Sequence, residues 1–401
     1  MPAYPHLEAL HAPPGMGTRL RAGMMRGLAK AFKIWPAPTT DIMAAIRVII
    51  IRPDHLGDML FMGPAMHWLR HRLPAAHIAL AMGPWSRASL PALTETYDEL
   101  IEIPFPAFER RKREGVIGRW RLLPHWSQQL GRGRYDAAII ARPDHWWGAA
   151  LARFAGIPVR LGYETPETAP WLTDALPLAH EHAVARNLRL LSSLPHDTLN
   201  PNPQEHPLRF DLSSRELGYA DALLLDIFGT YQPQPLAVIH PGSGAAIKLW
   251  EVKKWQEIAR RLVQKGLRVL VTGGSNEKEL TRAVAAVPEG DVIDLGGQTT
   301  FSLLAGLLAR AQIVLGPDSG PLHLAVAVGT PTVHLYGPSD ATIFGPWGDP
   351  ARHRSIRSTW TCAPCGKFDW NDPEQHKCVR DISVEEVWDA AQHILNQTAS
   401  P

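Results

Sequence analysis

The sequence places an aspartate where a short buried strand turns into a helix rich in small residues. The apolar run 313–315 predicts the strand, and residues 319–328 predict the helix. Asp318 or Ser319 suits the N-cap of this helix, and Pro321 suits its first turn. A helix start presents unpaired backbone N–H groups and the positive end of the helix dipole, which favour a phosphate. For residues 318–320 alone, a capped helix without a ligand is the favoured interpretation.

Two further loops after predicted strands combine glycines with one charged side chain. The first loop is 240–244 (HPGSG), and Lys248 follows it. Its backbone N–H groups can hold phosphate oxygens whose charge Lys248 can neutralise. The second loop, 272–277, contains Gly273 and ends on Glu277. The Glu277 carboxylate is placed to accept hydrogen bonds from ribose hydroxyls, or it simply favours the first turn of a helix.

Neither loop matches a common nucleotide-binding motif. Position 247 is isoleucine, so the third glycine of G-x-G-x-x-G is missing, and G-x-x-x-x-G-K-[ST] does not occur. These observations argue against an NAD-dependent dehydrogenase and a P-loop kinase. Residues 296–299 and 336–339 form two more loops of small residues after predicted strands. The five loops together indicate phosphate binding more strongly than any one of them.

The N-terminal half carries an aspartate and a repeated basic motif at predicted strand ends. Asp58 follows a glycine where the first strand turns into a helix, so it can be a general base or an N-cap. The tetrapeptide RPDH occurs at 52–55 and again at 142–145. It is compatible with ordinary turns, but two Arg/His pairs facing one cleft suit an anionic substrate. The residues expected to bind that substrate are Arg52, His55, Arg142 and His145.

The elements that position these residues alternate between strands and helices, which predicts α/β domains with doubly wound parallel sheets. Ligands of such sheets bind at the carboxyl ends of the strands. The Pro-rich stretch 195–210 is the clearest linker, and 401 residues suffice for two domains. The expected strands are 46–52, 76–82, 98–103, 135–142, 236–240, 267–272, 291–295, 312–316 and 332–336. The expected helices are 59–72, 107–132, 145–156, 251–265, 276–286, 301–309 and 319–328.

Composition narrows the class of protein. A net charge of +2 gives no general signal for nucleic-acid binding. We find no apolar run of the roughly 20 residues that span a bilayer and no signal peptide, so we expect a cytoplasmic protein. Residues 19–35 predict a helix with apolar residues on one face and basic residues on the other. Such a helix can lie on an anionic membrane or pack on the protein's own surface, and the sequence favours neither.

The three cysteines lie close together near the C-terminus. Together with a nearby histidine they have the composition of a Cys₃His metal site. Because a fourth cysteine is absent, we expect free thiols and no metal site. The residues concerned are Cys362, Cys365, His376 and Cys378.

The motifs resemble those of glycosyltransferase family nine, the lipopolysaccharide heptosyltransferases. The similar segments are RPDHLGD from Arg52, HPGSG followed by K-x-W at Lys248, TGG followed by Glu277, and DSGPLHLA from Asp318. The resemblance covers roughly residues 46–396. It implies a GT-B fold, in which two Rossmann-like domains have parallel sheets facing a central cleft. It also implies an ADP-heptose-type donor and an inverting, metal-independent transfer that requires no cofactor.

The resemblance also implies residue roles. Asp58 would be the base that deprotonates the acceptor, Lys248 would stabilise the leaving diphosphate, and Glu277 would hold the ribose. We expect an extension over 1–40, an acceptor-side domain over 41–200 and a donor-binding domain over 201–401. The remaining donor-binding residues would be Ser243, Gly244, Gly273, Asp318, Ser319, Gly320, Leu322 and His323.

The expected partners are a nucleotide-sugar donor and a lipopolysaccharide core or other glycolipid acceptor, without nucleic acid. Attachment to the inner face of the inner membrane is compatible with this function. Two other classes share the same features. A nucleotide-sugar epimerase of GT-B architecture would release its sugar without an acceptor. A non-catalytic sugar-nucleotide-binding subunit would not need Asp58 and Lys248 together.

Overall fold

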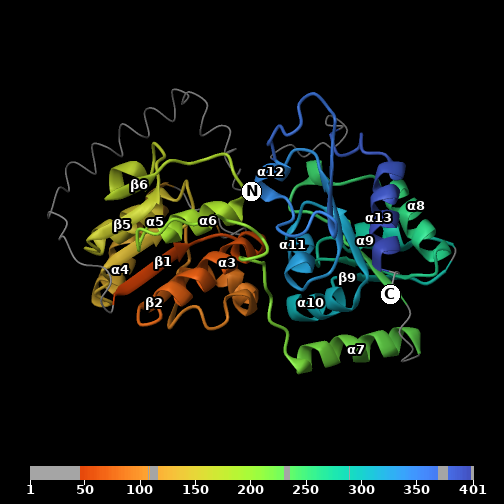
Figure 1. Cartoon of the computed structure of the whole chain (residues 1–401), viewed down its shortest axis with the longest axis horizontal. Helices are drawn as coiled ribbons and strands as arrows, with labels where there is room; N and C mark the ends of the chain where they lie inside the picture. Colours follow the sequence, from red (N-terminus) through yellow and green to blue (C-terminus); the bar gives the residue numbers. More distant parts are fainter. Residues whose placement is uncertain are drawn as a thin grey trace. The chain divides into compact units, whose positions relative to one another are not determined.

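The computed structural model describes residues 46–106, 108, 116–229, 235–288, 290–368 and 378–398. The chain divides into two compact units, Met1–Asn202 and Pro203–Pro401. Each unit contains a six-stranded sheet in which all neighbouring strands are parallel (Figure 1). The expected α/β class with two parallel sheets is confirmed. The amphipathic segment 19–35 lies outside the described residues.

The first unit has the strand order β3-β2-β1-β4-β5-β6. Its strands are β1 (Arg47–Arg52), β2 (His77–Met82), β3 (Glu99–Glu102), β4 (Ala137–Ile140), β5 (Val159–Tyr163) and β6 (Asp174–Leu176). Its helices are α3 (Leu56–Arg72), α4 (Val116–Arg132), α5 (Trp146–Phe154), α6 (Ala183–Ser192) and the 3₁₀ helices η1 (Pro84–Leu93) and η2 (Ala169–Trp171).

The central strands of this sheet are continuous apolar runs because both of their faces are covered. Ile49 and Ile51 of β1 pack in one buried cluster with Leu123 of α4 and with Trp147 and Leu151 of α5. The chain passes from β1 through α3 to β2 in one direction along the sheet, and from β4 through α5 to β5 in the other. Right-handed connections therefore place α3 and α5 on opposite faces. Helix α3 packs against α6 and η1.

The second unit has the strand order β12-β11-β10-β7-β8-β9. Its strands are β7 (Leu236–Ile239), β8 (Arg268–Gly273), β9 (Val292–Gly296), β10 (Ile313–Pro317), β11 (Thr332–Tyr336) and β12 (His353–Arg357). Its helices are α7 (Ser214–Phe228), η3 (Ala246–Lys248), α8 (Val252–Gln264), α9 (Lys278–Ala285), α10 (Phe301–Arg310), α11 (Gly320–Ala327), α12 (Ala341–Phe344) and α13 (Val384–Thr398).

The two sheets have equivalent topological switch points. In the first unit β1 lies between β2 and β4, and in the second unit β7 lies between β8 and β10. Connections on the two sides of such a point leave toward opposite faces of the sheet. The loops after β1 and β4 therefore separate in the first unit, and the loops after β7 and β10 separate in the second. Ligands of open parallel sheets bind there. The predicted functional residues follow β1 and β4 in the first unit, and β7, β10 and the neighbouring β8 in the second.

Several elements differ from the expectation. Helix α3 begins at Leu56, and its N-cap residue is His55. Asp58 therefore lies inside the first turn, and its interpretation as an N-cap is wrong. The sequence patterns did not identify β5, β6, α6, α7, β12, α12 or α13. Among the described residues, no helix combines the length and the apolar character needed to cross a lipid bilayer.

Candidate functional site

The predicted residues form two half-sites, one in each unit. The C-terminal half-site comprises the loops after β7, β8 and β10 with the start of α11. The N-terminal half-site comprises the loops after β1 and β4 with the start of α3.

Asp318 is the centre of the C-terminal half-site. Its carboxylate lies 2.6 Å from Lys248 Nζ through one oxygen and 3.2 Å from His323 Nε2 through the other. Its backbone carbonyl also accepts from Ser243 Oγ at 3.5 Å and from Lys248 Nζ at 3.4 Å. Burial would raise the pKa of Asp318, but the Lys248 charge and the contact with His323 outweigh it and lower the pKa. Asp318 is therefore a carboxylate that brings four predicted residues together.

The start of α11 lacks a side-chain cap. Ser319 occupies the N-cap position, but its side chain makes no capping hydrogen bond. Its buried hydroxyl has no hydrogen-bond partner among the described residues. A Cβ atom at Gly316 would lie 2.5 Å from the His240 carbonyl oxygen, so glycine allows β10 to approach the loop after β7. The first turn also contains Gly320 and the buried Leu322.

Glu277 links the loops after β7 and β8. The Gly274 N–H donates to Glu277 Oε2 at 2.7 Å, which turns the carboxylate back over its own loop. A Cβ atom at Gly242 would lie 2.2 Å from Glu277 Oε1, so this close approach requires glycine. Behind the carboxylate, His240 contacts Thr272 Oγ1 through Nδ1 at 3.1 Å. Burial lowers the pKa of His240, which favours a neutral ring that supports Glu277. Gly244 and Gly273 lie in these two loops.

The N-terminal half-site contains Asp58 in the first turn of α3, where it is half-buried. Its backbone carbonyl accepts from Arg52 Nη2 at 3.4 Å. Nearby, Asn187 of α6 accepts from Arg52 Nη1 at 3.0 Å and donates from Nδ2 to the Phe61 carbonyl at 2.9 Å. Side chains from β1 and α6 thus hold the beginning of the helix that carries Asp58.

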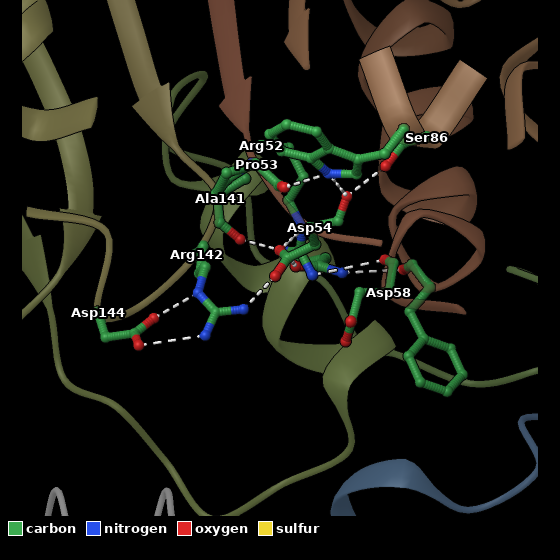
Figure 2. A network of polar contacts seen from close by, with 11 residues as sticks. Arg52, Pro53, Asp54, Asp58, Ser86, Ala141, Arg142 and Asp144 are labelled. Carbon is green, nitrogen blue, oxygen red and sulfur yellow. Dashed lines mark hydrogen bonds and ion pairs between the residues drawn. The ribbon is translucent and has the colours of Figure 1, made fainter. Parts of the chain in front are cut away.

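The repeated RPDH motif forms one ion network. Arg52 Nε lies 2.6 Å from Asp54 Oδ2, and Arg142 Nη1 pairs with Asp54 Oδ1. Arg142 also pairs with Asp144, with 2.6 Å between Nε and Oδ1 (Figure 2). The network forms because β1 and β4 are neighbouring parallel strands. Burial would raise the pKa of Asp54, but the charges of Arg142 and Arg52 hold it below its usual range.

The histidines of the repeat have different surroundings. His145 is buried against the rings of Phe105 and Phe108, with centroids 5.1 and 5.6 Å away. Burial, together with the charge of Arg142, lowers the pKa of His145 to about 3, so the ring is neutral near pH 7. His55 is half-buried and lies 6.0 Å from the Trp85 ring. The structure therefore does not form two equivalent Arg/His pairs.

The cysteines are free thiols in different environments. Cys362 is exposed, Cys365 is half-buried and Cys378 is buried. Burial raises the pKa of Cys378 to about 11, which disfavours the thiolate that a metal would bind. His376 lies outside the described residues. No group of three or more potential metal ligands occurs in the part of the chain that the structure describes.

Sequence comparison places this architecture among known proteins. The model of glycosyltransferase family 9 (heptosyltransferase) matches residues 124–374. Lipopolysaccharide heptosyltransferase 3 of Escherichia coli is 27% identical over 304 residues, which cover 73% of this chain and 84% of that protein. The match therefore extends over most of both chains.

Solved structures share the fold. The E. coli ADP-heptose lipopolysaccharide heptosyltransferase II has a TM-score of 0.67 at 23% identity, covering 88% of this chain and all of that one. A family 9 glycosyltransferase from Veillonella parvula has a TM-score of 0.70 at 22% identity, with 88% and 97% covered. The expected GT-B architecture is thereby confirmed.

Proposed function

This chain belongs to glycosyltransferase family 9, and we propose that it transfers a heptose from ADP-heptose, or a related sugar from a similar donor, to a lipopolysaccharide core acceptor. The similar proteins named above support the donor and the acceptor class. The observation that carries the proposal is the contact of Lys248 with Asp318 at the start of α11. It places a cation beside a helix N-terminus in the unit proposed to bind the nucleotide sugar.

In the proposed reaction, the C-terminal half-site binds the donor. The first-turn N–H groups of α11 and the Lys248 ammonium stabilise the negative charge that develops on the leaving diphosphate. Asp318 and His323 hold Lys248 in place and line the sugar side of the pocket. Glu277 accepts hydrogen bonds from the ribose hydroxyls. These groups supply positive charge from the protein itself, which supports metal-independent transfer.

Asp58 is the proposed general base. It takes the proton of the acceptor hydroxyl as that oxygen attacks the anomeric carbon, while the bond from this carbon to the diphosphate oxygen breaks. A single displacement of this kind inverts the configuration and requires no carboxylate nucleophile. Asp58 is half-buried in the first turn of α3, where a negative charge interacts favourably with the helix dipole. The base and the donor-binding groups therefore belong to different units.

Fewer residues are available to bind the acceptor than the sequence predicted. Of the four predicted residues, half-buried His55 keeps this role. Arg52 and His145 are buried, and Arg142 is bound to two carboxylates. Peripheral association with the inner face of the inner membrane remains a prediction, because the basic segment 19–35 lies outside the described residues.

The function is tested by product analysis with ADP-heptose, with and without a series of lipopolysaccharide acceptors truncated at successive points of the core. The proposed enzyme forms ADP and a heptosylated acceptor of inverted configuration, and it needs the acceptor. An altered sugar released without the acceptor would indicate an epimerase. Donor binding without any turnover would indicate a sugar-nucleotide-binding subunit.

A further inference from the structure

We propose that Asp54 is a positioning residue that fixes the first turn of α3, and with it the Asp58 carboxylate, through Arg52. The inference rests on the proposed function, in which Asp58 is the base. It gives Arg52 the task of holding the protein backbone, which differs from the acceptor binding predicted from sequence. Figure 2 shows the carboxylate of Asp54 at the centre of the contacts.

Asp54 is the member of the network that both arginines share. It is 1% exposed, and its two carboxylate oxygens pair with different arginines, Arg52 at the end of β1 and Arg142 after β4. Without this carboxylate, two guanidinium groups would face each other across a buried space. Asp54 therefore holds the Arg52 side chain at Nε, while the Ala141 carbonyl accepts from Nη1 of the same guanidinium group.

Arg52 transmits this position to α3 through two contacts. One guanidinium nitrogen donates to the Asp58 carbonyl at 3.4 Å. The other donates to Asn187 Oδ1 at 3.0 Å, and Asn187 in turn donates to the Phe61 carbonyl at 2.9 Å. The planar fork of an arginine can make these contacts together, because its donors are fixed relative to one another.

The backbone of Asp54 is held independently from the η1 side. Ser86 Oγ donates to the Asp54 carbonyl, and Trp85 Nε1 donates to the Pro53 carbonyl at 3.0 Å. The turn that leads from β1 into α3 is thus anchored at its start by η1 and at its end by Arg52. Such anchoring restricts the freedom of the Asp58 carboxylate.

The charges of the network favour positioning over substrate binding. Arg52 and Arg142 are matched by Asp54 and Asp144, so the four side chains sum to zero net charge. The Arg52 side chain is only 7% exposed, and its guanidinium nitrogens already contact Asp54, Asn187 and two backbone carbonyls, which leaves little of it for an acceptor phosphate. If Asp54 only stabilised the fold, its substitution would not selectively lower the kcat of the enzyme that remains folded.

The test compares kcat and the donor KM of Asp54→Asn with those of Asp144→Asn in the full-length chain. Asp54→Asn should lower kcat about 100-fold, the size expected when a reacting group is misplaced by about 1 Å, with little change in the donor KM. Asp144 binds the same Arg142, and among the described residues none of its hydrogen bonds or ion pairs reaches α3, so Asp144→Asn should keep a kcat near that of the wild type. Titration with ADP checks that the second unit is folded in both variants.

Arg52→Lys keeps the test decisive if Asp54→Asn does not fold. The lysine retains the charge next to Asp54, but its single ammonium cannot also reach Asn187 and the Asp58 carbonyl. It should therefore lower kcat about tenfold by partial misplacement of Asp58. A wild-type kcat in folded Arg52→Lys or Asp54→Asn would overturn the proposal. A fully active Asp58→Ala would instead contradict the base assignment, so the two failures are distinguishable.

Discussion

The two half-sites each place a buried aspartate at the end of a strand but surround it with different cations. Asp54 pairs with two arginines, and the more exposed of them, Arg142, has a side chain only 12% exposed. Asp318 pairs with Lys248, whose side chain is 17% exposed, and with buried His323. Arginine presents a rigid fork that holds several acceptors at once, whereas lysine carries a point charge on a flexible stem.

This difference assigns separate tasks to the two aspartates. The network of Arg52, Arg142, Asp54 and Asp144 contacts backbone carbonyls and sums to zero net charge, so it suits the fixing of a loop. Lys248 Nζ donates to the carboxylate and to the backbone carbonyl of Asp318, so one of the three donors of the ammonium remains for a diphosphate. Cation–π contact with the Phe368 ring, 4.7 Å from Nζ, further restricts its position. The first half-site therefore suits the positioning of the loop that carries Asp58, and the second suits the stabilisation of charge on the leaving diphosphate.

The largest effect is expected at the proposed base. Asp58→Ala should reduce kcat about 10²–10⁴-fold, the range that general base catalysis supplies, and should leave donor affinity unchanged because the donor groups belong to the other unit. Steady-state kinetics combined with calorimetric titration of ADP measures both quantities. Loss of ADP binding together with activity would mean that Asp58 serves the donor and is not the base.

Lys248→Ala tests whether the Lys248 ammonium stabilises the leaving diphosphate. Loss of one group that stabilises developing charge should reduce kcat/KM for the donor about 10²–10³-fold. Lys254→Ala is a suitable control, because Lys254 Nζ donates to the carbonyls of Arg380 and Ile382 on another part of the same unit. Equal kinetics for the two variants would remove Lys248 from the reaction.

Glu277→Gln should have a smaller effect that appears in donor binding. The substitution keeps the shape of the side chain but removes the charge that accepts from the ribose hydroxyls. Hydrogen bonds to charged groups contribute about 1.5–3 kcal/mol, so the donor KM should rise about tenfold or more while kcat changes little. A deoxyribose analogue of the donor checks the assignment. If the variant and the wild type discriminate equally against the analogue, Glu277 does not contact the ribose.

The parallel sheets could be predicted from sequence because their central strands are short apolar runs bounded by glycine and proline. The strands at one edge of the first sheet could not. Val159–Tyr163 contains an arginine and a glycine, and Asp174–Leu176 has only three residues. Helix α7 did have a local signal, the capping box formed by Ser213 and Glu216, but we assigned no element between the predicted linker, which ends at 210, and the strand at 236.

The half-sites show a similar limit. The glycine loops and the charged residues that follow them identified Lys248, Glu277 and Asp318 as candidates, because the chemistry there is local in sequence. The partners of Arg52 and Arg142 could not be inferred in the same way. Their pairing with Asp54 depends on the side-by-side placement of β1 and β4, which are separated by more than 80 residues. A charged motif alone does not show whether its charges face a ligand or each other.

The smallest effect on turnover is expected for His145, because its titration acts on stability. The folded-state pKa of about 3 lies below the ordinary value of about 6.5 because burial and Arg142 disfavour the charged ring, with Asp144 and Asp54 opposing them. Below pH 6.5 the unfolded chain therefore binds a proton that the folded chain does not. The free energy of unfolding should fall with decreasing pH down to about pH 3, by at most about 1.4 kcal/mol per pH unit from this residue.

His145→Gln removes this titration, so its free energy of unfolding should depend less steeply on pH between 6.5 and about 3 than that of the wild type. Denaturant unfolding at several pH values measures the slope, and the variant of exposed His125, His125→Gln, should keep the wild-type slope. The acceptor KM at pH 7.5 should also stay close to the wild-type value, because a buried neutral ring offers no charge to an anionic substrate. A large rise in that KM would show that His145 contributes to acceptor binding. It would also contradict the assignment of a purely positioning role to the buried residues of the first half-site.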